Sequence, residues 1–170
     1  MEKNLLSKEM SFEKQEGRFL TFLLDENGYG IPILKVSEII GLVDITPVPK
    51  TPDFIKGVIN LRGKIIPLMD LRLKFSMQER AYDQNTCIII INIEIKNSIK
   101  QIGVIVDIVS EVCNIPASEI EEPPSYNSEN EDNFLIGVGK IKDKVIMLLD
   151  IEKVIFTADL IHLFKEDKLD

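Results

Sequence analysis

The sequence feature that most constrains the fold is a fifteen-residue stretch that occurs twice. Gly57–Leu71 reads GVINLRGKIIPLMDL, and Gly137–Ile151 reads GVGKIKDKVIMLLDI. In each copy two apolar runs flank a polar pair, Arg62-Gly63 in the first and Lys142-Asp143 in the second. Gly63 can adopt the positive φ that a tight hairpin turn requires. Each copy therefore predicts a β-hairpin, and the aspartate that follows the first one, Asp70, is placed to cap a short helix.

A second match lies upstream and in the same order. Gly30–Ile39 (GIPILKVSEI) aligns with Gly103–Val112 (GVIVDIVSEV), with a shared Val-Ser-Glu. Two ordered matches indicate an internal duplication, with repeats at about residues 18–80 and 87–151. Because β-branched runs alternate with turns rich in Gly and Pro, we expect a mainly β protein of paired small barrels rather than a parallel α/β sheet.

Other stretches predict individual elements. Residues 1–17 are expected to be a mobile leader, and residues 151–165 an amphipathic helix, because their apolar residues recur at helical spacing. Leu34–Ile40 predicts one helical turn, and Gln101–Ile115 a long strand or a bent pair of strands. The strand Arg18–Asp25 carries apolar residues on both faces. It is either buried on both or buried on one and docked to a partner on the other, and the pattern favours one exposed face.

Composition excludes several classes of function. A net charge of −8 and a pI of about 4.8 argue against nucleic acid as a partner, because phosphate binding needs a basic surface. No apolar run is long enough to cross a bilayer, and the first residues lack the pattern of a signal peptide. Cys87 and Cys113 lie far apart and are expected to be reduced core thiols. These features predict a cytoplasmic protein without direct membrane insertion.

A search for catalytic motifs finds little. The single histidine, His162, has no second histidine and no cysteine near it in the sequence, so no metal site and no catalytic role is expected. The acidic stretch Glu119–Asn133 lacks the glycine and the terminal glutamate of a calcium loop, and it is expected to be a solvated loop. We therefore predict no cofactor. A carboxylate pair leaves no local signature, so an enzyme or a small-molecule binding protein with a cleft between two lobes remains an alternative.

Two charged residues allow two interpretations. Glu38 precedes the proline-rich connector Thr46–Pro52, and Arg62 lies at the tip of the first hairpin. They could be ordinary exposed charges that contribute little stability even when paired. They could instead meet above apolar neighbours and shape a recognition surface, since such surfaces combine a charged rim with an apolar centre. Spacing alone does not separate these interpretations.

The run Phe54–Leu71, with its Asn60-Leu61-Arg62-Gly63 core, resembles the signature of CheW, the bacterial chemotaxis coupling (adaptor) family. Tyr29–Ile39, Thr46–Pro49 and the second-half runs Gly103–Val112 and Phe134–Ile151 are also similar to this family. The resemblance covers roughly residues 18–156. It implies two small five-stranded (SH3/OB-like) barrels side by side. Whether strands of one copy are exchanged into the other, and which ones, remains open.

The resemblance also implies a function. Members of this family are non-catalytic adaptors between the regulatory domain of the histidine kinase CheA and the cytoplasmic tip of chemoreceptors, in receptor arrays at the inner face of the membrane. By resemblance, the kinase-binding residues are Leu20, Ile33 and Val36. The receptor-binding residues are Glu38, Asn60 and Arg62, with Glu38 paired to Arg62. A coupling protein of another chemosensory pathway, such as pili or cyclase signalling, is the alternative.

Overall fold

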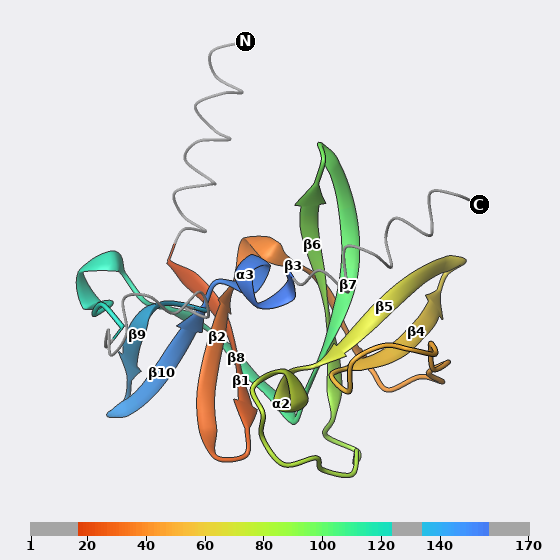
Figure 1. Cartoon of the computed structure of the whole chain (residues 1–170). Helices are drawn as coiled ribbons and strands as arrows, with labels where there is room; N and C mark the ends of the chain where they lie inside the picture. The colour runs from red at the N-terminus through yellow and green to blue at the C-terminus, as the bar shows by residue number, and fades with distance from the viewer. Residues whose placement is uncertain (1–16, 124–133, 157–170) are drawn as a thin grey trace.

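The computed structural model describes residues 17–123 and 134–156 of the chain (Figure 1). Most of the expected leader, part of the acidic stretch and the expected helix beyond residue 156 lie outside the described residues. Within them, strands dominate: β1 (Arg18–Leu24), β2 (Asn27–Pro32), β3 (Val36–Gly41), β4 (Ile55–Leu61), β5 (Lys64–Asp70), β6 (Cys87–Ile95), β7 (Ser98–Val106), β8 (Ile108–Asn114), β9 (Leu135–Ile141) and β10 (Lys144–Leu149). The short helical elements are η1 (Ile33–Lys35), α2 (Leu71–Lys74), η2 (Ala117–Glu119) and α3 (Ile151–Ile155).

The strands form two five-stranded sheets, which lie side by side in Figure 1. The first lobe is the sheet β3-β6-β7-β5-β4, and the second lobe is the sheet β8-β1-β2-β10-β9. The hairpin β1–β2 thus joins the C-terminal strands, whereas the hairpin β6–β7 joins β3, β4 and β5. Parallel pairs, β2 with β10 and β5 with β7, hold the exchanged hairpins in place. The leading hairpin of each repeat is therefore the element that changes lobes.

A single bridge links the two edges of each sheet. After β3, Thr46 exchanges two backbone hydrogen bonds of 2.9 Å with Val58 of β4. After β8, Glu121 exchanges equivalent bonds of 2.9 and 2.8 Å with Val138 of β9. A Cβ atom on Gly57, where φ is +143°, would lie only 2.1 Å from the Thr46 carbonyl oxygen. The glycine that begins the repeated stretch is therefore required for this close approach of two backbones.

Both repeated hairpins form as the sequence predicts. Arg62 and Gly63 have φ values of 51° and 86°, and Lys142 and Asp143 have φ values of 49° and 67°. Positive φ at both central residues is the geometry of two-residue hairpin turns that matches the strand twist. Asp70 then caps α2, since its carboxylate accepts hydrogen bonds from the amides of the two residues that follow Leu71.

The strand β1 is buried on both faces. Leu20, Phe22 and Leu24 lie in the main core cluster, which contains residues of both sheets, while Phe19 lies in a separate cluster inside the second lobe. Our expectation that β1 exposes one face is therefore wrong. The reason is that the second lobe has an interior of its own on one side of β1 and packs against the first lobe on the other.

Two other stretches refine the expectations. The helical turn expected over Leu34–Ile40 is instead the 3₁₀ turn Ile33–Lys35, and Val36–Gly41 is a strand. Its branched residues pair with the isoleucine-rich strand β6, which outweighs their helical spacing. Gln101–Ile115 contains a bent pair of strands, since β7 ends at Val106 and β8 begins at Ile108. No helix among the described residues is long and apolar enough to cross a membrane.

Candidate interaction surface

A β-bulge in β3 directs the predicted site residues to two different faces. Val36 pairs with Ile91 of β6, but Glu38 pairs with the adjacent residue Ile90, so one extra residue, Ser37, is accommodated between them. Residues two apart in a regular strand share a face, and a bulge reverses this relation. Val36 accordingly packs against the core between the lobes, whereas Glu38 lies on the other face of the strand.

The repeat carries the same bulge. In β8, the register with β1 shifts between Val112 and Val109, around Ser110 and Glu111. There the hydroxyl of Thr21 donates to the Glu111 carbonyl oxygen at 2.7 Å and accepts from the Glu111 amide at 3.2 Å. The repeated Val-Ser-Glu of the sequence is thus the site of a bulge in each lobe.

Glu38 and Arg62 meet. The Arg62 guanidinium donates to the Glu38 carboxylate, which links edge strand β3 to the β4–β5 turn. Arg62 is 71% exposed and Glu38 28% exposed, so the pair lies at the surface. Asn60 forms a hydrogen bond within the hairpin turn through its side chain. Its carbonyl oxygen accepts a hydrogen bond of 2.9 Å from the Gly63 amide and thereby holds the turn that carries Arg62.

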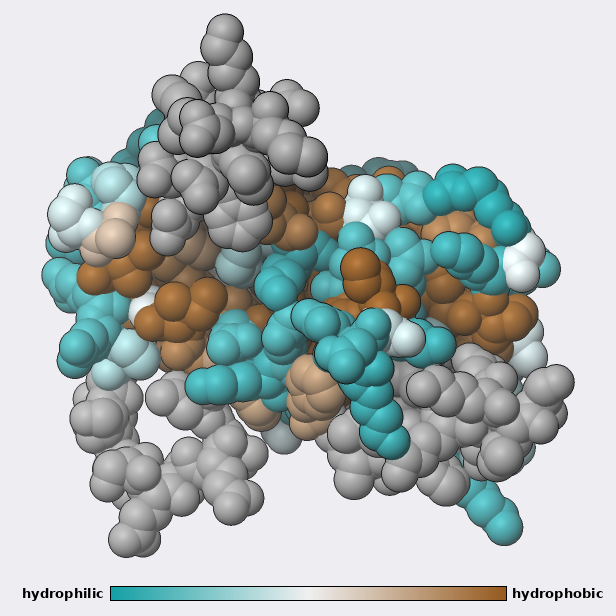
Figure 2. Space-filling model, turned by 90° about the horizontal axis from the view of Figure 1, so that it is seen from above, coloured by the Kyte–Doolittle hydropathy of each residue, from teal (hydrophilic) through white to brown (hydrophobic). Residues whose placement is uncertain are grey.

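Apolar side chains are exposed on the strands that carry this ion pair. Ile39 is adjacent to Glu38 and 42% exposed, and Ile65, just after the turn, is 54% exposed. Leu42 and Val43 extend the exposed apolar residues along the chain. Across the molecule seen from above, hydrophobic residues reach the surface in separate patches between hydrophilic ones (Figure 2). The ion pair therefore lies among side chains that could pack against another protein.

The three residues assigned to kinase binding are not equally accessible. Ile33 in η1 and Val36 in β3 are half-buried and pack against the core between the lobes. Leu20 is only 2% exposed and belongs to that core itself. Leu20 therefore cannot offer its side chain to a partner in this conformation, because both faces of β1 are covered. It lies in the cluster that supports Ile33 and Val36.

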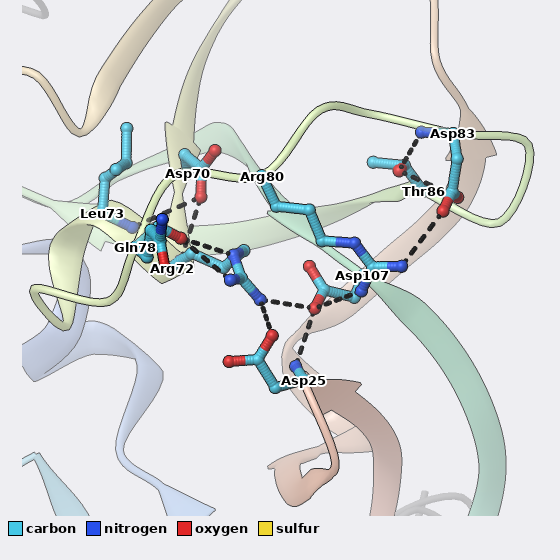
Figure 3. Close-up of polar contacts among 9 residues, drawn as sticks. All are labelled: Asp25, Asp70, Arg72, Leu73, Gln78, Arg80, Asp83, Thr86 and Asp107. Carbon is cyan, nitrogen blue, oxygen red and sulfur yellow. Dashed lines mark hydrogen bonds and ion pairs between the residues drawn. The ribbon is translucent and has the colours of Figure 1, made fainter.

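A buried polar cluster that sequence reasoning missed joins the two lobes (Figure 3). The Arg72 side chain, 7% exposed, donates hydrogen bonds of 2.6 Å to Asp25 and 2.7 Å to Asp107. Its other nitrogens donate to the Gln78 carbonyl oxygen at 3.0 and 2.8 Å. Asp25 belongs to the β1–β2 turn of the second lobe, Arg72 to α2 of the first, and Asp107 to the crossing between them.

The positive charge of Arg72 is stabilised by the carboxylates of Asp25 and Asp107. Burial lowers the pKa of Arg72, but hydrogen bonds and attraction from Asp25 and Asp107 outweigh this effect, and the net pKa is raised. Nearby, the Tyr82 hydroxyl donates to the buried Asp70 carboxylate at 2.7 Å. Burial and this carboxylate raise the pKa of Tyr82, which keeps it protonated as a donor.

A related ion pair of opposite polarity occurs in the other repeat. Glu152, which aligns with Arg72, accepts a hydrogen bond from Lys35 of η1, at the crossing from β2 to β3. The helices α2 and α3 each therefore form an ion pair with a segment in which the chain crosses from one lobe to the other. The signal that could have revealed this was an opposite charge at one matched position, two residues after a capping aspartate in both repeats.

The described residues contain no group of three or more His, Cys, Asp or Glu side chains that could hold a metal ion. Cys87 and Cys113 are unpaired and only half-buried, so they are less enclosed than expected. Burial and the neighbouring Glu111 raise the pKa of the Cys113 thiol, which disfavours the reactive thiolate.

Comparison with known proteins agrees with this architecture. Residues 18–158 match the family model described as CheW-like domain. The chain is 41% identical over 142 residues to the chemotaxis protein CheW of Klebsiella aerogenes, covering 84% of this chain and 83% of that protein. It is 31% identical over 138 residues to CheW of Helicobacter pylori, covering 81% of each protein.

A solved structure is also similar. The crystal structure of the scaffolding protein TtCheW from Thermoanaerobacter tengcongensis matches with a TM-score of 0.72 and 37% identity, over 84% of this chain and 90% of that one. The family model covers most of the chain, and the sequence and structural matches agree with it. The chain belongs to the CheW family of non-catalytic chemotaxis coupling proteins.

Proposed function

We propose that this protein couples the cytoplasmic tips of chemoreceptors to the histidine kinase CheA, in receptor arrays on the cytoplasmic side of the membrane. The observation that carries the proposal is the surface ion pair between Glu38 and Arg62, flanked by exposed Ile39 and Ile65. An exposed pair of this kind adds little to stability, at most about 1 kcal/mol. Its geometry is better suited to recognition than to holding the fold.

The receptor side of the proposal uses the first lobe. Arg62 projects from a two-residue turn that Asn60 braces, so its position is fixed although most of its side chain is in water. A receptor tip is helical, and a helix presents apolar residues at i, i+3 and i+4 beside polar ones. Ile65 would pack against such an apolar stripe, while Glu38 and Arg62 would meet its polar edge. Ile39, the next residue after Glu38 in β3, lies instead on the face of Val36.

The kinase side of the proposal uses the other face of β3. Ile33 and Val36 are half-buried, and Leu34 between them is 40% exposed. Because the bulge at Ser37 turns Val36 away from Glu38, the proposed kinase contacts and the ion pair lie on different faces of β3. In this proposal Leu20 does not contact the kinase; it belongs to the core cluster against which Ile33 and Val36 pack.

Arg62→Ala tests the receptor side, with Lys142→Ala as the matched control. Lys142 occupies the equivalent turn of the second lobe and forms no ion pair with the described residues. We expect both variants to fold with a loss of stability below about 1 kcal/mol. Arg62→Ala should lose receptor-dependent activation of CheA in a reconstituted kinase assay, whereas Lys142→Ala should retain it. Equal activation by Arg62→Ala and wild type would reject the assigned role of Arg62.

A further inference from the structure

The second lobe contains a pocket of about 280 Å³ between β1, β2, β8 and the β9–β10 turn. Its lining includes Leu23, Gly28, Ile141 and Ile146, with Lys142 and Lys144 from the turn. This pocket lies within one lobe, so it is distinct from a cleft between the lobes and from the Glu38–Arg62 surface. Because the chain is duplicated, the first lobe shows what normally occupies the equivalent space.

In the first lobe that space is filled by a side chain. Gly28 pairs with Leu23 across the β1–β2 hairpin, and at the matched positions of the β6–β7 hairpin Gln101 pairs with Asn92. The Gln101 amide donates hydrogen bonds of 3.1 Å to the Asn92 carbonyl oxygen and to the Ser37 hydroxyl. The second lobe has a glycine in place of Gln101. The Ile146 side chain covers this glycine, with its Cδ1 2.5 Å from where a Cβ atom would lie, and Gly28 and Ser110 still line the pocket.

Two further interior positions carry smaller residues in the second lobe than in the first. Gly139 of β9 aligns with Ile59 of β4, which is fully buried in the core of the first lobe. Thr21 of β1, which pairs with Gly30, corresponds to Ile90 of β6, which pairs with Gly103. All three positions carry smaller residues in the second lobe. The side chains of Ile146 and Ile115 take up part of the space at Gly28 and Gly139, and the pocket is the space that remains.

The mouth of the pocket also differs between the lobes. Arg62 is neutralised by Glu38 in the first lobe, but neither Lys142 nor Lys144 forms an ion pair within the part of the chain that the structure describes. Glu111 is the one carboxylate in the lining, so the two ammonium groups leave an excess of positive charge. The walls are apolar at Leu23, Ile141 and Ile146.

We propose that this pocket binds a small carboxylic acid with a compact apolar body. The apolar body would pack against Leu23, Ile141 and Ile146, and the carboxylate would lie at the mouth between Lys142 and Lys144. A volume of about 280 Å³ is at the lower end of ligand pockets and suits a single-ring or branched acid of roughly ten non-hydrogen atoms. Such a small ligand binds weakly, with a dissociation constant of about 0.1 to 10 mM.

The test is a titration of the isotope-labelled full-length chain with cyclohexanecarboxylate, followed by amide chemical shifts. Saturable shifts are expected in β1, β8 and the β9–β10 turn. Cyclohexanecarboxamide, which keeps the ring and lacks the charge, should bind several-fold more weakly, and cyclohexylmethylamine should not bind. Absence of saturable shifts with the acid, or equal binding of the three probes, would overturn the proposal.

Variants separate the pocket from non-specific attraction. Gly28→Gln restores the residue type of the filled lobe and should abolish binding. A Cβ atom there would lie 2.5 Å from the flexible Cδ1 of Ile146, which can move aside. Should this variant fail to fold, the double variant Lys142→Gln with Lys144→Gln tests the proposal instead. Its affinity for the acid should fall about fivefold, and its affinity for the amide should not change. Lys64→Gln, at the matched position of the first lobe, should bind as wild type does, and an equal loss in this control would contradict the proposal.

Discussion

Replacing Arg72 by methionine tests whether the buried polar cluster holds the two lobes together. Methionine keeps most of the apolar length of the side chain but removes four hydrogen bonds, two of them to carboxylates. Asp107 is 11% exposed, so its charge would remain largely buried. Breaking a buried ion pair costs about 3–5 kcal/mol, and the 50% exposure of Asp25 places the estimate at the lower limit, about 3 kcal/mol.

That loss is large enough to measure. For a chain of this size, about 3 kcal/mol corresponds to a decrease in melting temperature of roughly 6–12 °C. Urea unfolding followed by circular dichroism gives the free energy, and calorimetry gives the melting temperature. The control is Arg62→Met, which breaks an ion pair at a guanidinium that is 71% exposed and should cost less than about 1 kcal/mol. If both variants lose the same stability, the assignment of Arg72 as the link between the lobes is wrong.

Three further changes test the bridge, the thiol and the kinase-facing residues. Gly57→Ala would place a methyl group against the Thr46 carbonyl and break two backbone hydrogen bonds. The free energy of unfolding in urea titrations should therefore fall by about 2 kcal/mol or more. Because the pKa of Cys113 is raised, its alkylation by iodoacetamide at pH 8 should be slower than that of a free cysteine, and a rate equal to that of free cysteine would contradict the assigned environment. Val36→Glu should weaken binding of CheA at an unchanged melting temperature, whereas Val109→Glu at the matched position should not, and a collapsed fold would show that Val36 is a core residue.

Local signals in the sequence were sufficient for local structure. Gly63 marked the turn and Asp70 marked the helix cap, because both act through the backbone of their immediate neighbours. The repeated motifs indicated a duplicated β unit, and two five-stranded sheets are present. The resemblance also paired Glu38 with Arg62, and the structure confirms this contact. Their roles in binding remain predictions.

The failures share a physical cause, which is that packing partners distant in sequence decided the outcome. The apolar residues of Val36–Gly41 have a spacing that fits a helix and also fits a strand with a bulge. Pairing with β6 stabilises the strand. Exposure of β1 could not be judged, because sequence does not show that the hairpin packs in the lobe built by the C-terminal strands. Arg72 was missed for the same reason, since its carboxylate partners lie 47 and 35 residues away.

The hairpin exchange also determines the order in which the molecule can be assembled. β1 and β2 leave the ribosome before the other described strands, yet Gly30 pairs in parallel with Leu148, close to the end of the described chain. The hairpin β1–β2 therefore lacks its partner β10 until residue 148 has been synthesised. Neither repeat contains a complete sheet, so we expect two fragments made by cutting the chain between β5 and β6 to fold only on each other.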